Sequence, residues 1–325
     1  MPKVLIINCI HYRTIKLTNF SIKISIITLL FSSIIFGQNN GSFIICLGIA
    51  QDGGYPHLGC QNNCCNIAWE NDSNSRYIVS YAIADSLNKK WYLFEATPDI
   101  KKQIELFKSK TNQYYNYLPD AIFITHAHIG HYTGLMEFGR EVMSTNNLPV
   151  YVLPKLKSFL ENNGPWSQLV ELQNITLNKL SQNIELELNN HISVTTFTVP
   201  HRDEYSETAG FQITFGKKKA LFIPDIDKWA KWSESIVEKV RGVDYAFIDA
   251  TFMSMIELKN RNIKEVPHPL ISETMDLFKN ESSETKSKIY FTHFNHTNPV
   301  LIDSKIREEI RLNNFNLSEQ GKRYY

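Results

Sequence analysis

Short apolar runs alternate with polar, turn-forming segments over most of the chain, and this pattern predicts a mixed α/β domain. Apolar runs that end at Gly, Pro, Asn or Asp are typical of buried β-strands. The strands predicted in this way are Phe43–Ala50, Tyr77–Ala84, Lys90–Ala96, Ala121–Thr125, Val150–Leu153, Ile192–Val199, Gly210–Phe215, Ala220–Ile223, Tyr245–Ile248 and Ile289–Phe291. We expect the second and third of these strands to pair as a hairpin.

Helices are predicted between several of these strands. Pro98-Asp99 is a typical helix start and predicts a helix over 99–108. Further helices are expected over 134–142 and from Pro154, and the charged segment 303–325 is expected to be a surface helix or tail. Because the strands fall into two sets with helices outside them, the pattern favours layered α/β packing over a strict βαβ alternation.

The first 38 residues follow a different pattern. Four basic residues precede the apolar run Ile24–Phe36, and the small residue Gly37 follows it. This arrangement is typical of a secretory signal peptide. The run is shorter than the roughly 20 apolar residues of a membrane-spanning helix, although an uncleaved anchor is the alternative. We therefore expect a signal peptide over 1–38, a domain over 39–325, and a periplasmic or secreted protein with no stable membrane span after cleavage.

Composition narrows the class of partner. The 325 residues carry a formal net charge of +1, with 43% hydrophobic and 21% charged residues. Such a chain can bury a large core, and no run of Lys and Arg indicates a nucleic-acid surface. We expect a small-molecule substrate and no nucleic acid as partner.

Three cysteines cluster near His57, at Cys60, Cys64 and Cys65. In an oxidising compartment, a Cys60–Cys64 or Cys60–Cys65 disulfide is one interpretation. A zinc site made of the three thiolates, perhaps with His57, is the other. Cys46 lies inside an apolar strand and is expected to be a buried structural thiol.

The densest chemical signal is the segment Thr125–His131, which directly follows a predicted buried strand. It places His126, His128 and His131 within six residues, and closely spaced histidines at a strand end can converge on one cation. Five later polar residues also lie at or just after predicted strand ends, namely His201, Asp225, Asp249, His293 and His296. We interpret this series as a metal site, with Asp249 orienting a ligand histidine.

In this order, the motifs resemble the metallo-β-lactamase superfamily over about residues 43–299. Within it, the chain is most similar to the coenzyme PQQ synthesis protein B branch. That closer similarity rests on Gly53-Gly54-Tyr55-Pro56, Glu95-Ala96-Thr97-Pro98-Asp99-Ile100, Pro200-His201-Arg202-Asp203-Glu204, Ile223-Pro224-Asp225 and His293-Phe294-Asn295-His296-Thr297-Asn298-Pro299. The resemblance implies a four-layer αββα sandwich with two mixed sheets and a metal site at one edge of them.

The resemblance also implies a ligand set. His126, His128 and His201 would bind a first metal ion, Asp225 would bridge, and His131 and His293 would complete a second site. Gly130 stands where the superfamily usually has an aspartate that binds the second metal. One zinc ion is therefore expected, while the second is uncertain.

The function expected from this site is an exported zinc hydrolase that uses a metal-bound hydroxide on an ester, lactone, amide or phosphodiester. Asp225 would position the hydroxide. His296 would donate a proton to the leaving group, or would be a residue outside the reacting centre. Two alternatives remain open at this point. One is an iron-loaded, oxygen-dependent enzyme resembling the PQQ synthesis protein B branch, and the other is a non-catalytic protein that binds a metal or small molecule.

Overall fold

The computed structural model describes residues 41–258 and 266–325, so the predicted signal peptide at 1–38 lies outside the described residues. The described residues form one compact unit. Within the described ranges, no helix has both the length and the apolar character that a membrane crossing needs.

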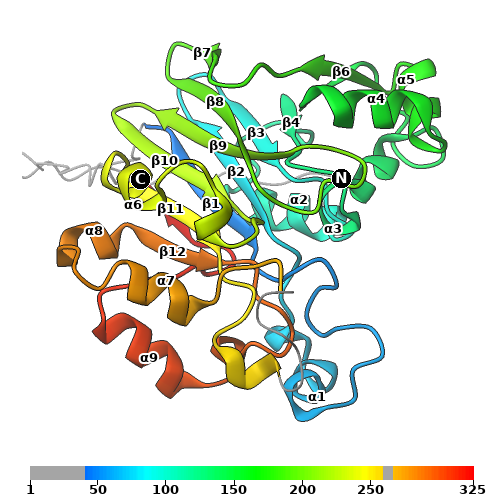
Figure 1. Ribbon diagram of the computed structural model, residues 1–325. Coiled ribbons are helices and arrows are strands. Elements are labelled where there is room, and N and C mark those ends of the chain that lie inside the picture. The colour runs from blue at the N-terminus through cyan, green and yellow to red at the C-terminus, as the bar shows by residue number, and fades with distance from the viewer. Residues whose placement is uncertain (1–40, 259–265) are drawn as a thin grey trace, which may run out of the picture. The chain divides into compact units, whose positions relative to one another are not determined.

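Two seven-stranded mixed sheets form the centre of this unit (Figure 1). The first has the order β14 (Arg323–Tyr324), β1 (Phe43–Gly48), β2 (Ser80–Asp85), β3 (Lys90–Phe94), β4 (Ala121–Phe123), β5 (Leu148–Val152), β6 (Ile175–Lys179). The second has the order β13 (Asn316–Leu317), β12 (Ile289–Thr292), β11 (Tyr245–Asp249), β10 (Lys218–Ile223), β9 (Thr208–Phe215), β8 (Ile192–Val199), β7 (Glu185–Asn189). Strands β2 and β3 pair antiparallel, which confirms the predicted hairpin.

Helices cover the outer face of each sheet, which confirms the four-layer αββα arrangement (Figure 1). The α-helices are α1 (Asn63–Glu70), α2 (Ile100–Lys110), α3 (Ile129–Tyr132), α4 (Pro154–Asn162), α5 (Trp166–Glu171), α6 (Ile236–Arg241), α7 (Ile271–Leu277), α8 (Ser283–Ser287) and α9 (Ser304–Leu312). Apolar side chains of α2, α4 and α5 pack on the first sheet, and those of α6, α7 and α9 pack on the second.

Side-chain alternation along β1 shows how the layers are separated. Ile44 and Cys46 point into the core between the sheets, whereas Phe43, Ile45 and Leu47 point into the core under the helices. Both sets are buried because successive side chains of a strand face opposite sides of its sheet. Cys46 is the buried thiol that was predicted, and burial raises its pKa to about 12.

Two predicted segments differ in the structure. The predicted helix over 134–142 is wrong, because the chain forms a short 3₁₀-helix at Thr133–Phe138. The backbone N–H of Gly134 donates to the carbonyl oxygen of Ala96 at 2.8 Å, which holds this segment tightly against the neighbouring loop. The C-terminal segment contains the predicted helix as α9, but it also supplies edge strands to both sheets, β13 to the second and β14 to the first.

We expect Phe222→Ala to lower the free energy of unfolding by about 3–5 kcal/mol, the usual effect of truncating a buried phenylalanine. Phe222 lies between the sheets, with its ring 5.2 Å from that of Tyr81 and 5.9 Å from that of Phe94. Leu87→Ala is the control, because Leu87 is 58% exposed. Urea denaturation of both variants measures the difference, and equal midpoints would contradict the placement of Phe222.

Candidate metal centre

Parallel pairing of strands brings the candidate metal ligands together. Strands β10, β11 and β12 are parallel neighbours, so their carboxyl ends lie at one edge of the second sheet. Asp225, Asp249 and His293 are carried by these ends. Facing them, β4 of the first sheet leads into His126 and His128. The edge where the two sheets meet therefore collects side chains that are far apart in the sequence.

A first group of donor atoms surrounds one oxygen of Asp225. His126 Nε2 lies 2.8 Å from His128 Nδ1, which lies 3.2 Å from His201 Nε2. Asp225 Oδ2 is 3.1 Å from His201 Nε2 and 3.4 Å from His126 Nε2. All four donor atoms lie within 4.8 Å of one another. Three imidazole nitrogens and one carboxylate oxygen at such spacing suit a divalent cation such as zinc.

A second group uses the same Asp225 carboxylate. It contains His131 and His293, as the sequence predicted, and also Asp52, which sequence reasoning missed. Asp52 Oδ1 lies 3.0 Å from His131 Nε2 and 3.6 Å from His293 Nε2, and Asp225 Oδ2 lies 3.8 Å from His131 Nε2. The sequence feature that could have indicated Asp52 as a ligand is its position in the Gly-rich turn after β1.

The outer nitrogens of three of these histidines face polar groups, two through hydrogen bonds and that of His131 opposite a carboxylate. Thr125 Oγ1 lies 2.8 Å from His126 Nδ1, and Glu95 Oε1 lies 3.4 Å from His131 Nδ1. Thr251 Oγ1 lies 2.9 Å from His293 Nδ1 and donates its own proton to Asp249 at 2.7 Å. The Thr251 hydroxyl thus links Asp249 to His293 through two hydrogen bonds. Each arrangement leaves the Nε2 atom free for the centre, as metal-binding histidines require.

Several buried atoms of the centre have no hydrogen-bond partner in the described part of the chain. They include Asp52 Oδ1, His131 Nε2, His293 Nε2 and Asp225 Oδ1. An unsatisfied buried polar atom costs about 1–3 kcal/mol, so several at one point form an unfavourable arrangement on their own. A cation that accepts these lone pairs removes the cost. The residues therefore fit a metal ion.

Both carboxylates of the centre are held in the charged form. Burial alone would raise the pKa of Asp225, but His201, His268 and His293 around it keep the pKa well below its usual value. Burial likewise opposes ionisation of Asp52, and its contacts with His131 and His293 keep its pKa well below the usual value. The centre thus offers two negative charges to a cation.

His268 is a second residue that sequence reasoning missed. It sits in Pro267-His268-Pro269, which follows no strand and carries no metal-site spacing. Its Nδ1 lies 2.8 Å from Asp249 Oδ2 and 3.1 Å from Asp225 Oδ1. Burial would lower its pKa, but Asp249 and Asp225 raise it to about 10. His268 thus carries a proton beside the Asp225 carboxylate.

The cysteine cluster forms a separate group of donors. Cys60, Cys64 and Cys65 are free thiols that lie with His296 within 4.8 Å of one another. Cys60 Sγ is 3.8 Å from Cys64 Sγ, far beyond the roughly 2.05 Å of a disulfide bond. His296 Nδ1 is 3.4 Å from Cys65 Sγ, and its ring stacks on that of His57 at 4.4 Å. The structure thus groups His296, the predicted proton donor, with the thiols.

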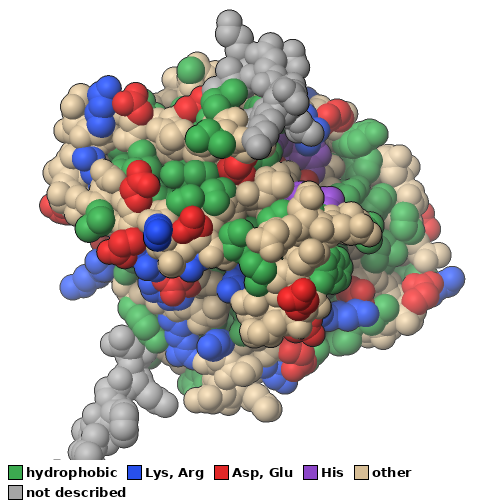
Figure 2. All heavy atoms as spheres, turned by 90° about the horizontal axis from the view of Figure 1, so that it is seen from below, with side chains coloured by type: hydrophobic (Ala, Val, Ile, Leu, Met, Phe, Trp, Pro, Cys, Tyr) green, Lys and Arg blue, Asp and Glu red, His purple; other side chains and the backbone are tan. Residues whose placement is uncertain are grey.

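The histidine centre is largely shielded from solvent. His126, His131 and His293 are buried, and the side chain of His128 is 14% exposed. On the face in Figure 2, histidine atoms show only as small patches, and acidic and basic side chains are interspersed around them. His128 is the partly exposed histidine of the first group, and its Nε2 lies 3.3 Å from Oε2 of Glu204, whose side chain is 51% exposed.

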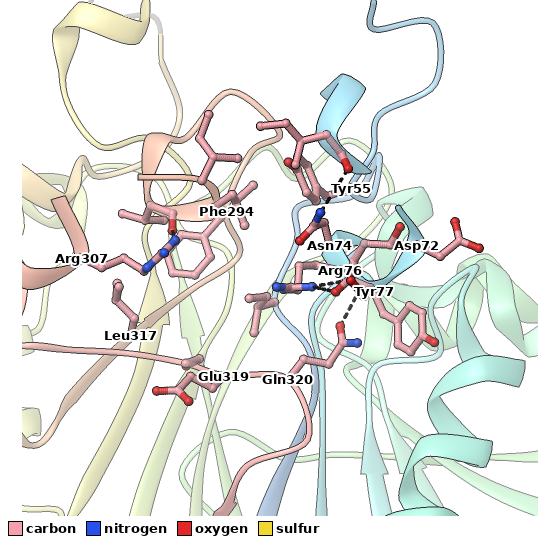
Figure 3. Close-up of a pocket in the computed structure, with 18 of the residues that line it drawn as sticks. Tyr55, Asp72, Asn74, Arg76, Tyr77, Phe294, Arg307, Leu317, Glu319 and Gln320 are labelled. Carbon is pink, nitrogen blue, oxygen red and sulfur yellow. Dashed lines mark hydrogen bonds between the residues drawn. The ribbon is translucent and has the colours of Figure 1, made fainter. Parts of the chain in front are cut away.

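A cavity of about 790 Å³ lies elsewhere, between the loop after α1 and the segment before α9 (Figure 3). Arg76 and Arg307 line it, and each donates to backbone carbonyl oxygens. No carboxylate of the described chain lies within 4.0 Å of either guanidinium. None of the histidine or cysteine donors lines this cavity, so it is not the reacting centre.

Comparison with known proteins agrees with this fold. The beta-lactamase superfamily domain model matches residues 90–294. Coenzyme PQQ synthesis protein B of Methylorubrum extorquens (strain PA1) is 25% identical, over 86% of this chain and 98% of that protein. The same protein of Rhizobium meliloti (strain 1021) is 22% identical, over 86% and 96%.

Solved structures show the same fold. Zn²⁺-bound PqqB from Methylobacterium extorquens superposes with a TM-score of 0.71 at 23% identity, covering 87% of this chain and 99% of that one. A diphosphatase of the PhnP family gives 0.63 at 19% identity, covering 87% and 96%. The chain therefore belongs to the beta-lactamase superfamily, and over most of its length it is similar to coenzyme PQQ synthesis protein B.

Proposed function

We propose that this protein is a metal-dependent hydrolase of small ester, lactone, amide or phosphodiester substrates. The observation that carries the proposal is the set of three imidazole nitrogens around Asp225 Oδ2, of which that of His128 belongs to a partly exposed side chain. A zinc ion bound there would acidify a water molecule and polarise the oxygen of a scissile bond. The zinc in the related Methylobacterium extorquens structure supports the choice of metal.

The residues of the chain supply the rest of the chemistry. The ionised Asp225 holds its two oxygens at fixed positions, one toward the histidines and one toward His268. His268 holds a proton next to this carboxylate and is fixed by Asp249. This geometry favours His268 over His296 as the group that protonates the leaving atom, because His296 lies against the cysteines.

A second candidate is an iron-loaded, oxygen-dependent enzyme. The name of the relatives assigns them to PQQ synthesis, and they match this chain over 86% of its length. Nitrogen and carboxylate donors with open positions suit iron as well as zinc. Metal analysis of the purified protein separates the candidates: zinc with metal-dependent hydrolysis supports the first, and iron with oxygen consumption supports the second.

We also propose a structural zinc ion at Cys60, Cys64, Cys65 and His296. Three thiols and one imidazole match a Cys₃His set, which closes a tetrahedral zinc site without an open position for substrate. Such an ion would tie the loop before α1 to the segment after β12. The predicted fourth ligand, His57, would instead pack on the ring of His296.

We expect His128→Ala to lower metal-dependent hydrolysis by about 100-fold or more, since loss even of an outer partner of a metal ligand costs about 10–100-fold. The assay compares bis(p-nitrophenyl) phosphate, p-nitrophenyl acetate and a lactone, with and without chelator. His191→Ala is the matched control, because His191 is exposed at the turn between β7 and β8. Full activity of His128→Ala toward the substrate that the parent protein cleaves would contradict the proposed site.

The cysteine site gives a separate expectation. Cys65→Ser and His296→Ala should each lower zinc content and the thermal midpoint, because both lose a direct ligand. His57→Ala is the matched control and should retain the zinc. Zinc is measured by mass spectrometry of the metal together with thermal denaturation. Loss of zinc in His57→Ala with retention in His296→Ala would reverse the assignment of the fourth ligand.

A further inference from the structure

Gly130 has an environment that explains why no side chain is present there. A Cβ atom at this position would lie 2.5 Å from Asp52 Oδ1, 2.6 Å from Asp52 Cα and 2.8 Å from Asp52 Cγ. These distances are shorter than any ordinary contact, and Cα belongs to the backbone, so rotation of the Asp52 side chain cannot relieve the overlap. The loop that carries Asp52 therefore occupies the space of a side chain at position 130.

Backbone hydrogen bonds hold this loop in place. The N–H of Gln51 donates to the carbonyl oxygen of Phe294 at 2.9 Å, and the N–H of Phe294 donates to that of Ile49 at 2.8 Å. Phe294 directly follows His293, so the same bonds fix Asp52 and His293 relative to each other. Both residues belong to segments that are already ordered by the sheets.

We infer that Asp52 is a carboxylate ligand for a second cation, together with His131, His293 and Asp225, and that Gly130 makes room for it. The inference rests on the proposed metal centre and deepens it. The carboxylate that the superfamily usually supplies at position 130 is supplied here from the loop after β1. The second site is then complete, and Gly130 gives no reason to regard the protein as a non-catalytic remnant.

The contacts of Asp52 favour this role over a structural one. Its Oδ1 atom is buried and has no hydrogen-bond partner in the described part of the chain, as is also true of His131 Nε2 and His293 Nε2. A carboxylate oxygen buried only for stability would be hydrogen-bonded, because its desolvation is costly. Asp52 Oδ1 lies 3.0 Å from His131 Nε2 and 3.6 Å from His293 Nε2, so the three unsatisfied atoms face one another.

A competing arrangement would place the second ion among Asp225, Asp249, His268 and His293, which also lie close together. In that group, His268 Nδ1 already bonds to Asp249 Oδ2 at 2.8 Å, and Asp249 Oδ1 accepts from Thr251. His268 Nδ1 and both Asp249 oxygens are therefore already occupied, and only Asp225 and His293 keep unpartnered atoms in that group. The Asp52 group keeps free lone pairs and is the better cation site.

The test measures zinc bound per chain after metal removal and titration, independently of any activity. Asp52→Ala should bind one equivalent less than the parent protein, and the matched control Asp72→Ala, an exposed aspartate, should bind the same amount as the parent. With cobalt in place of zinc, the thiolate-to-cobalt absorption of the cysteine site should remain, which locates the loss in the histidine centre. Equal stoichiometry of Asp52→Ala and the parent would overturn the inference.

A second variant removes no donor atom. Gly130→Ala must displace the Asp52 loop and should also lose one equivalent, whereas Gly242→Ala should not, because its Cβ would lie no closer than 3.6 Å to the nearest contact. For the same reason, Gly130→Asp should not gain metal. Retention of all zinc by Gly130→Ala would contradict the steric account. The two claims can fail separately. If the parent protein hydrolyses none of the substrates while Asp52→Ala still binds one equivalent of zinc less, the proposed function is refuted and this inference stands.

Discussion

The buried carboxylate of Asp225 is the group on which the metal centre depends. Its side chain is 2% exposed, and four histidines lie within 3.9 Å of its Oδ2 atom. A buried negative charge is unfavourable unless it is paired, and the protonated His268 pairs only with the Oδ1 side of Asp225, at 3.1 Å, while the four imidazoles gather on its Oδ2 side. A cation between them satisfies the carboxylate and the imidazoles together. The two sheets supply the rigid strand ends that keep these groups at such short distances.

Two of the described non-glycine residues with an unusual backbone conformation lie at this centre. Glu95 and His293 both have positive φ, 76° and 63°, which side chains other than glycine seldom adopt. Glu95 faces His131, and His293 faces Asp52, so both strained residues contact the second group. Such conformations persist where the surrounding structure imposes them, and they gather at functional sites.

Much of the fold was predictable because each buried strand has an apolar run that ends at a turn residue. Strands β6 and β7 were not predicted, since β7 alternates Glu and Leu and is only partly buried. The six predicted metal-site residues all lie in the two donor groups, because strand ends place them at one edge. Asp52 and His268 were missed for different reasons: Asp52 resembles an ordinary turn former, and His268 is brought in by a bridge between Phe252 and Leu270 that no local pattern indicates.

The central claim is that Asp225 is shared by two cations, the first held by His126, His128 and His201 and the second by His131, His293 and Asp52. Anomalous X-ray diffraction at the zinc edge from crystals of the zinc-loaded protein measures this directly. The account predicts two peaks beside Asp225, about 3.5–4 Å apart as in other two-metal sites, with Asp52 bound to one of them. A single peak beside Asp225, or two peaks with Asp52 turned away from both, would contradict it.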